Sequence, residues 1–479
     1  MRQADVVIAG GGVAGSFAAA MLGRAGINAV IVDPHPVYPE DFRCEKLDGT
    51  QMHTVGLTGL ADAVLRASTA DRECWVARFG HVVEKRPGDQ QGIMYDTLVN
   101  TARAEIPASV PFVHAKVTDI TTGPERQIVK LSNGDEIAAR LVVVATGLNP
   151  GVREKLGIVR DIISAGHSIS IGFDAKPADP RGFPFPALTY FSESPADKMA
   201  YITLFPIGSP RAGEPSARSR ASSTRYGEPP ARAPLVAAPA PRVANAPLGG
   251  AALRANLFGY RHLHDPWLKQ LRETPRETLY GIWPGLRRLM GDFTVDGFVK
   301  IRPVDLYVTQ NYRQQGIVLV GDAFATSCPA AGTGARKALV DVERLCNVHI
   351  PRWLATPGMG EDKIAMFYDD PVKTECDAWS NAKAFNFREV SIGSGPYWQA
   401  QRWARFLSYL GRGSLRRLQR PQAVAAMLPS ACTTGRQYRK SAAGTPGSGA
   451  AAWQLQHACT GFGCGRQRLA RVSWWVKAV

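Results

Sequence analysis

The feature that most constrains the fold is a glycine-rich turn near the N-terminus, Gly10-Gly11-Gly12-Val13-Ala14-Gly15. It follows the apolar run Asp5 to Ala9 and precedes the helix-forming stretch Ser16 to Ala25, after which a second apolar run covers Asn28 to Val32. This order of strand, turn, helix and strand predicts a compact βαβ unit with parallel strands. The glycines satisfy the G-x-G-x-x-G spacing, in which the first permits a tight turn and the last lets helix and strand pack closely.

Nucleotide binding is the chemistry that this unit favours. Gly10, Gly12, Val13, Ala14 and Gly15 would place free backbone N–H groups and the positive end of a helix against a diphosphate. Asp33 closes the second strand, where a carboxylate can accept hydrogen bonds from ribose hydroxyls. The turn alone is a weak signal, but the strand, turn, helix, strand and acid together predict a dinucleotide site.

Two later apolar runs extend the predicted sheet. Leu141 to Gly147 and Ile317 to Asp322 are both continuous and both contain a glycine, as buried parallel strands do. Their wide separation implies that a second domain is inserted between them. The intervening runs at Ser168 to Phe173, Met199 to Phe205 and Ala255 to Tyr260 are short and aromatic-rich, which favours an antiparallel sheet. Its aromatic side chains either line a substrate site or form core.

A second motif identifies the cofactor. Gly321-Asp322-Ala323, then Cys328 to Gly334, then a helical stretch from Ala335 to Leu345 resembles the second flavin motif of the aromatic hydroxylase group of flavoprotein monooxygenases. The resemblance implies that Asp322 binds the ribityl chain of FAD. It also implies backbone contact with the isoalloxazine at the residues Pro329, Gly332 and Gly334. A helix start there would stabilise the negative charge of reduced flavin.

The resemblance extends to two weaker segments, and it covers about residues 1–205 and 254–410. In Phe42 to Leu47, Arg43 takes the place of an arginine on the flavin side of the nucleotide, with a solvated side chain as the alternative. Val113 to Ile120 resembles a strand whose backbone, near Val117, meets the adenine. The family's middle motif has an acid where this chain has Thr146, so NADPH or NADH as electron donor is an open expectation.

The expected fold is α/β, with a Rossmann-like FAD/NAD(P)-binding domain containing a parallel sheet, a mostly antiparallel β substrate domain interleaved with it, and C-terminal helices. The predicted helices are Asp362 to Tyr368, Val372 to Phe385 and Trp398 to Leu410. Residues 1–160 and 301–350 are predicted to form the FAD-binding domain. Residues 161–300 are predicted to form the substrate domain, with a disordered insertion at 210–253. The C-terminal helices are expected at 351–411, and a disordered or aberrant tail at 412–479.

The activity that the resemblance implies is hydroxylation of an aromatic or polyprenylated small molecule through a flavin hydroperoxide. The flavin performs the difficult chemistry, so no catalytic side chain is identified; His53 and Tyr190 are possible polar contacts, with structural roles as the alternative. A flavin-dependent halogenase is another alternative, but the W-x-W-x-I-P signature of those enzymes is missing from this sequence. An isoprenoid reductase and a non-catalytic flavin-binding protein stay open as alternatives.

The formal charge of +16 raises the question of an anionic partner. Residues 210–253 contribute +4 and residues 412–479 contribute +11, with no acid in the latter, so the rest of the chain is nearly neutral. This distribution argues against nucleic acid as a partner. Both segments lack sustained apolar periodicity, and they are either a natural insertion and tail or translations of a shifted reading frame.

A cytoplasmic protein is expected. The eight cysteines lie far apart without the spacing of a metal site, which favours reduced thiols and no bound metal. The first apolar run enters the glycine turn directly, as a strand does and a signal peptide does not. Trp398 to Leu410 is expected to pack its apolar positions against the body, and peripheral membrane contact through this helix is the less favoured alternative.

Overall fold

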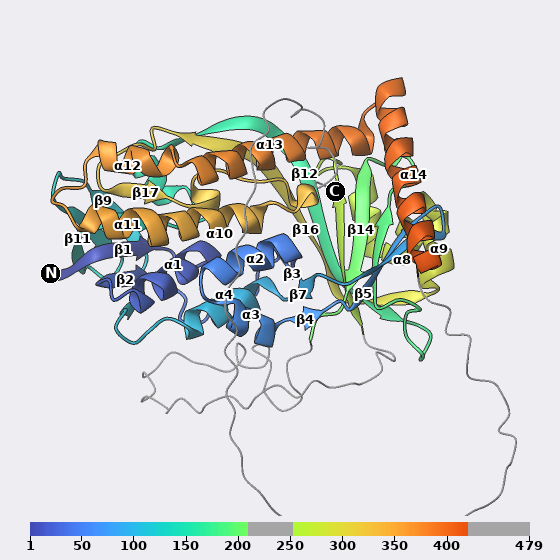
Figure 1. The fold of residues 1–479 in the computed structure, drawn as a ribbon, viewed down its shortest axis with the longest axis horizontal. Helices are drawn as coiled ribbons and strands as arrows, with labels where there is room; N and C mark the ends of the chain where they lie inside the picture. Colours follow the sequence, from blue (N-terminus) through green and yellow to red (C-terminus); the bar gives the residue numbers. More distant parts are fainter. Residues whose placement is uncertain (209–251, 420–479) are drawn as a thin grey trace, which may run out of the picture. The chain divides into compact units, whose positions relative to one another are not determined.

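The computed structural model describes residues 1–208 and 252–419 (Figure 1). All of these residues belong to one compact unit, Met1–Pro421. Its first sheet has seven strands in the order β8-β2-β1-β11-β10-β9, with β17 paired to β11. The strands are β1 (Arg2–Ala9), β2 (Ala29–Val32), β8 (Phe112–Val113), β9 (Val117–Thr121), β10 (Gln127–Leu131), β11 (Glu136–Val144) and β17 (Ile317–Leu319).

The centre of this sheet is parallel, as the continuous apolar runs predict. β1 pairs in parallel with both β2 and β11, and β11 pairs in parallel with β17 through Val142 to Val144. Every residue from Val6 to Ala9 and from Leu141 to Val144 is almost completely buried. Strands that are covered on both faces need apolar side chains at successive positions, which explains the absence of alternation.

Helices surround this sheet and position the candidate site. α1 (Val13–Arg24) follows β1 directly and contacts α4 (Tyr95–Ala104) and α10 (Gly334–Arg344). A capping box forms at the N-terminus of α2 (Gly49–Leu57), where Asp48 accepts from the Gln51 N–H and the Gln51 side chain accepts from the Asp48 N–H. The other helices of this part are α3 (Ala61–Ala67), α5 (Gly151–Lys155), α11 (Ile350–Leu354) and α12 (Glu361–Tyr368).

The second sheet also has seven strands, in the order β16-β12-β15-β14-β13-β5-β6. All its pairs are antiparallel except β13 with β5. Its strands are β5 (Glu73–Arg78), β6 (His81–Pro87), β12 (Val159–Pro177), β13 (Ala187–Phe191), β14 (Met199–Phe205), β15 (Leu253–Gly259) and β16 (Phe293–Gln310). A separate three-stranded sheet contains β3 (Lys46–Leu47), β4 (Thr69–Ala70) and β7 (Gln91–Gly92).

The two faces of the second sheet have different partners. One face packs its buried residues Ile171, Phe173 and Leu257 with three short helices into a core of its own; these helices are α7 (Pro266–Glu273), α8 (Pro275–Ile282) and α9 (Pro284–Met290). The opposite face meets the first domain, because Arg254 forms a buried ion pair with Glu45. The sheet therefore separates a closed core from the side on which the glycine turns lie.

Two long helices follow near the C-terminal end of the described chain. α13 (Pro371–Ile392) contacts α10 and α14, and α14 (Pro396–Gln419) also contacts β6. Both were predicted as shorter helices. The tail expected from Arg412 is wrong for residues 412–419, because they continue α14. The predicted insertion at 210–253 falls outside the described residues except at its end, where Leu253 begins β15.

One predicted strand is also wrong in detail. The stretch Val113 to Ile120 is two strands, since β8 ends at Val113 and β9 begins at Val117. β8 pairs with β2, whereas β9 pairs with β10 in an antiparallel hairpin. The hydrophobic pattern continues across the bend because both strands bury side chains in the same core.

Candidate cofactor site

The first glycine turn is fixed by close backbone packing. Gly10 has φ +108°, and a Cβ there would lie 2.6 Å from the carbonyl oxygen of Ala145 at the end of β11. A Cβ on Gly15 would overlap the carbonyl oxygen of Gly10. Only glycine fits at these two positions, which confirms the structural reason for the motif.

The start of α1 is open for an anion. Gly12 precedes the helix, which begins at Val13 and Ala14, and neither a side-chain cap nor an acidic residue occupies the first turn. A Cβ on Gly12 would meet only the Tyr95 hydroxyl, at 3.6 Å. The positive end of the helix dipole thus faces a position beside the Tyr95 hydroxyl that has space for a phosphate.

Asp33 lies at the end of β2 beside this turn, with only 10% of its side chain exposed. Its carboxylate accepts from the Gly11 N–H at 2.7 Å and from the His35 N–H at 2.9 Å. The Arg103 guanidinium lies 3.1 Å from the same carboxylate and donates to the Gly11 carbonyl at 2.6 Å. The acid is therefore held against the glycine turn, as an acceptor for a ribose would have to be.

The second predicted segment forms a series of tight turns before α10. These are η2 (Gly321–Ala323) and η3 (Pro329–Ala331), and Gly321 and Gly332 both have positive φ, +59° and +66°. A Cβ on Gly332 would meet no atom within 4 Å, and at Gly334 it would meet only the Ser327 side chain at 3.7 Å. The backbone before α10 is thus accessible to a ligand at a helix start.

The two segments lie against each other. A Cβ built on Gly321 would lie 3.7 Å from the Cβ of Ala14, and α1 contacts α10. Gln51 of α2 also reaches the second segment, because its side-chain amide donates to the Gly332 carbonyl at 2.7 Å. The structure therefore brings the first glycine turn and the second motif together.

Arg43, in the predicted segment Phe42 to Leu47, pairs with the second motif. Its guanidinium donates to Asp322 at 3.1 Å and to Asp41 at 2.6 Å, and it lies over the Tyr95 ring at 5.5 Å. Burial opposes its charge, but neighbouring Tyr95, Asp322 and Asp41 raise the pKa of Arg43 above its ordinary value. Only 21% of the side chain is exposed, so the solvated alternative for Arg43 is wrong.

Val117 is the predicted residue with the least direct connection to the others. It begins β9, partly buried against the core of the first sheet. Four residues earlier, the Val113 carbonyl accepts from the Asp33 N–H at 3.1 Å. The chain therefore leaves the neighbourhood of Asp33 just before Val117, and contact of Val117 with an adenine stays a prediction.

A buried group of charges supports the second segment from behind. Asp341 of α10 accepts from the Gly321 N–H at 2.8 Å and from the Lys373 ammonium at 2.8 Å. Lys373 also donates to Asp377 at 2.9 Å, and Lys337 donates to the Ala325 carbonyl at 3.1 Å. Burial alone would lower the pKa of Lys373, but Asp341 and Asp377 raise it. These partners keep the ammonium charged.

The second sheet adds a polar wall on the same side. Arg254 and Asn256 of β15 both donate to Glu45, at 2.7 and 2.8 Å, and all three side chains are buried. The Tyr201 hydroxyl of β14 donates to the Ala330 carbonyl in η3 at 2.9 Å. This face of the sheet therefore touches the segment that was predicted to meet the isoalloxazine.

Several of these residues were missed from the sequence. Tyr95 and Arg103 lie in α4, and neither belongs to a recognisable motif. Gln51 could have been found as the third helical residue of a capping box after Asp48, although its contact with Gly332 could not. Lys373 was missed because a lysine in a predicted helix normally indicates a solvated face.

The structure also places the other residues singled out from the sequence. Tyr190 is buried; its hydroxyl donates to Glu193 and accepts from the Gly80 N–H at 2.9 Å, which confirms the structural alternative. His53 is exposed on α2. Thr146 donates to the Asn149 carbonyl at 3.3 Å within its own turn. Among residues 1–208 and 252–419, no group of three His, Cys, Asp or Glu side chains could hold a metal ion.

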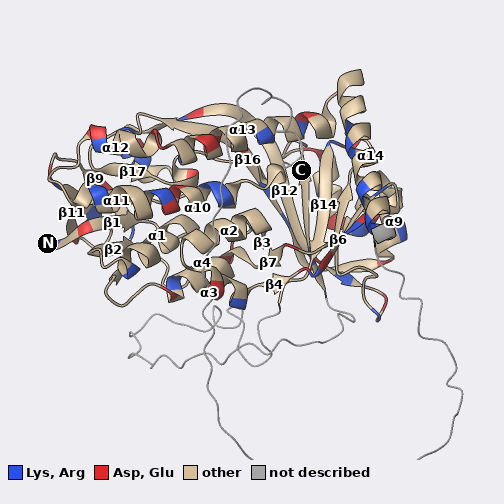
Figure 2. Cartoon of the chain, in the orientation of Figure 1, with Lys and Arg blue, Asp and Glu red and all other residues tan. Residues whose placement is uncertain are grey.

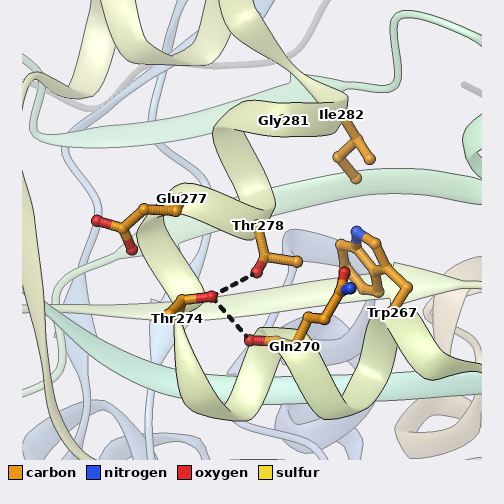
Figure 3. Close-up of a pocket in the computed structure, with 7 residues that line it drawn as sticks. All are labelled: Trp267, Gln270, Thr274, Glu277, Thr278, Gly281 and Ile282. Carbon is orange, nitrogen blue, oxygen red and sulfur yellow. Dashed lines mark hydrogen bonds between the residues drawn. The ribbon is translucent and has the colours of Figure 1, made fainter.

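An open depression lies elsewhere, between α7 and α8 (Figure 3). It has a volume of about 500 Å³, and Thr274 in it donates to the Gln270 carbonyl at 3.2 Å and lies 3.1 Å from Thr278. Its lining residues are Trp267, Gln270, Thr274, Glu277, Thr278, Gly281 and Ile282. None of them belongs to the glycine turns, so this depression is separate from the candidate cofactor site.

Comparison with protein families agrees with this geometry. Residues 3–226 match the family model described as FAD binding domain. This match covers slightly less than half of the chain and supports an FAD-dependent oxidoreductase. A curated relative, the ubiquinone hydroxylase UbiL of Rhodospirillum rubrum, is 27% identical over 174 residues; the match covers 33% of this chain and 40% of that relative's length.

Solved structures share the fold of this chain over most of its length. p-Nitrophenol 4-monooxygenase PnpA from Pseudomonas putida superimposes with a TM-score of 0.63 at 15% identity, covering 87% of this chain and 97% of that one. The flavin-dependent brominase Bmp2 gives 0.55 at 15% identity, covering 88% and 90%. At these identities the likeness establishes the fold and confirms the predicted α/β class.

Proposed function

We propose that this oxidoreductase is an FAD-dependent monooxygenase that hydroxylates an aromatic or polyprenylated small molecule. The observation that carries the proposal is the meeting of the two flavin segments at Ala14 and Gly321, beside the ion pair of Arg43 with Asp322. This junction lies in a chain whose residues 3–226 match an FAD binding domain. The hydroxylase relative supports the reaction class.

The residues present fit FAD. Gly10, Gly12 and Gly15, with Val13 and Ala14 at the helix start, would hold the diphosphate, and Asp33 would accept from the adenosine ribose. Asp322 and Arg43 would hold the ribityl side of FAD, and Val117 would contact the adenine. The isoalloxazine edge would lie against Pro329, Gly332 and Gly334. The open space at Gly12, Gly332 and Gly334 is the structural support for these assignments.

The same geometry supports a proposed division of the chain into domains. Residues 1–160 and 301–350 would form the FAD-binding domain, 161–300 the substrate domain and 351–411 the C-terminal helices. β5 and β6 depart from a division by sequence alone, because they join the second sheet although they lie within residues 1–160. The substrate domain therefore begins with strands that the FAD-binding part of the chain contributes.

FAD, when bound, would supply the redox chemistry that activates oxygen. The chain would supply orientation and exclusion of water. Tyr201, through its bond to the Ala330 carbonyl, would fix the η3 backbone, and the buried group of Glu45, Arg254 and Asn256 would form a rigid polar wall. The aromatic side chain of Phe42, which lies against Gly172, would close the site on an apolar substrate.

NADPH or NADH is the proposed electron donor. Thr146 stands where related enzymes place an acid, so donor recognition would use other groups. The test is anaerobic addition of each nicotinamide to the purified yellow protein, followed by its visible absorbance. Bleaching by one of them supports the proposal, and no bleaching by either in the presence of substrate contradicts this part of it.

The experiment for the reaction class measures oxygen consumption together with product mass. Phenols and a short-chain prenylated phenol are supplied with the reduced protein, and the product is expected to gain one oxygen atom for each oxygen molecule consumed. Oxygen consumption without an oxygenated product contradicts the monooxygenase assignment. Saturation of a double bond would support an isoprenoid reductase, and a product halogenated in the presence of bromide would support a halogenase.

We also propose a cytoplasmic location. The five cysteines in the described part of the chain, Cys44, Cys74, Cys328, Cys346 and Cys376, are all unpaired thiols. Reduced thiols suit a reducing compartment. Cell fractionation with compartment markers tests this. In the part of the chain that the structure describes, every helix is too short or too polar to cross a bilayer.

A further inference from the structure

The helix α14 packs on the second sheet through one side only. Phe406 makes an edge contact with Phe79 at 5.9 Å, and Tyr409 contacts Phe191 at 5.5 Å. Gly413 is buried so closely on β6 that a Cβ there would overlap the Val83 carbonyl oxygen. These positions are three or four residues apart and so share one face of the helix. The alternative of packing on the body is therefore confirmed for this face.

Beside this packed face, α14 carries large apolar side chains that the described chain covers only in part, and Trp403 makes an edge contact with Phe406 at 5.8 Å. Trp403 is 50% exposed, Leu407 60% and Leu410 36%. Their spacing of four and three residues aligns them, and we call these three residues the outer stripe. Tyr397, 62% exposed, and Leu415, 58% exposed, extend the apolar surface toward the two ends of the helix.

The charge around the outer stripe is positive. Pro396–Gln419 contains five arginines and no acid, and Figure 2 shows only basic colouring along α14. Arg402 donates to the carbonyls of Val390 and Gly393, and Arg405 donates to the neutral amide of Asn386. Arg412 and Arg416 lie within ion-pair distance of a single carboxylate, that of Glu84. The carboxylates therefore offset only part of the charge.

We propose that the outer stripe of α14 docks on the surface of an anionic lipid bilayer, with the helix lying in the plane of the interface. A surface helix with Trp and Leu on one face and arginines on its flanks has the composition that inserts at the boundary between headgroups and acyl chains. Tryptophan and tyrosine prefer this boundary because their rings are amphipathic. The arginines would extend toward anionic headgroups.

Two observations favour a bilayer over a second copy of this chain. A symmetric dimer through α14 would bring two acid-free, arginine-rich helices together, which like-charge repulsion opposes. The sequence after α14, residues 420–479, adds eight Lys or Arg and no acid, which strengthens attraction to anionic lipids. The proposal does not depend on the reaction that the flavin site performs.

The test is sedimentation of the full chain with vesicles of phosphatidylcholine alone or with about one third phosphatidylglycerol. Binding is expected only to the anionic vesicles, with a loss of about tenfold in the partition coefficient when salt rises from low to physiological concentration. Leu407→Glu and Trp403→Glu should each reduce binding to anionic vesicles at least tenfold. Retained flavin absorbance and circular dichroism show that each variant is folded.

The matched control is Leu65→Glu, which changes a leucine of α3 that is 46% exposed and should leave binding unchanged. Three outcomes overturn the proposal. The first is that wild-type protein fails to bind anionic vesicles. The second is that the Leu407→Glu and Trp403→Glu variants bind these vesicles as well as wild type does, which would assign binding to the basic sequence after α14. The third is that light scattering shows a dimer that Leu407→Glu dissociates, which would assign the outer stripe to a second copy.

Discussion

Arg43 and Asp322 lie 279 positions apart in the sequence, and the guanidinium of the first donates to the carboxylate of the second over 3.1 Å. Both residues were predicted to contact FAD, from separate motifs. Their direct pairing means that each positions the other before any ligand binds. Such preorganisation reduces the entropy that is lost when a cofactor is captured.

Arg43→Ala is expected to weaken FAD binding by about 10-fold to 100-fold, since a hydrogen bond to a charged group contributes about 1.5–3 kcal/mol. Flavin fluorescence titration of the apoprotein measures the change. Arg181→Ala is the matched control, because Arg181 also pairs with an aspartate, Asp179, but is 88% exposed on the surface. Equal FAD affinity for both variants would contradict the role of the Arg43 and Asp322 pair.

Gly15→Ala tests the contact between α1 and the first turn. The added methyl group would overlap the Gly10 carbonyl, so the expected loss of stability is about 1–3 kcal/mol or more, with loss of bound FAD. Thermal unfolding followed by circular dichroism measures it. Gly56→Ala in α2 meets no atom within 4 Å and should instead stabilise the protein by about 0.5–1 kcal/mol. Similar effects of the two changes would refute the packing argument.

Lys373→Met leaves the carboxylate of Asp341 buried without its ammonium partner. Removing one member of a buried ion pair is expected to cost about 3–5 kcal/mol, measured by urea unfolding. Adding Asp341→Asn should recover part of this loss, because an uncharged amide oxygen still accepts from the Gly321 N–H. The exposed pair Lys269 and Glu273 is the control, and its removal should change stability by less than about 1 kcal/mol. No recovery in the double variant would show that the charge pair is not the cause.

Asp370 predicts a pH dependence of stability. Burial alone would raise its pKa, but hydrogen bonds from Arg344 and His349 and the Lys373 N–H lower the pKa of Asp370 to about 2. A lowered pKa stabilises the folded state above the unfolded value of about 4, and this contribution is lost as pH falls toward 2. The difference in Tm between wild type and Asp370→Asn should therefore be largest above pH 4 and disappear near pH 2.

Asp179→Asn is the control for this pH series. Hydrogen bonds from Arg181 lower the pKa of Asp179 to about 2 as well, but the pair is exposed. Water screens such a pair, so its removal should hardly change Tm at any pH. A Tm difference for Asp370→Asn that stays constant from pH 7 to pH 2 would rule out ionisation of Asp370 as the source.

Local patterns predicted the sheet and the glycine turns well. The continuous apolar runs gave the parallel strands β1, β2, β11 and β17, because burial on both faces leaves no polar position. The turn at Gly10 was predictable because backbone contact with Ala145 excludes any side chain. The bend between Val113 and Val117 was not, since both strands feed the same core and the pattern does not change.

Long-range contacts limited the prediction of the site. Lys337, Lys373 and Asp377 look like solvated positions of α10 and α13, and only the packing of the two helices buries them together. The periodicity of α14 was visible, but an amphipathic helix with apolar residues on two sides does not reveal which side faces the sheet. Gly413 decides it, because its missing side chain lets β6 approach.

The pairing of β17 with β11 has a consequence for synthesis. Val142 to Val144 take Ile317 to Leu319 as neighbours, so a nascent chain carries an unsatisfied sheet edge from residue 144 until residue 319 has left the ribosome. Asp322 and the turns that follow it emerge later still. The two predicted flavin motifs can therefore meet only late in translation, after the second has been synthesised.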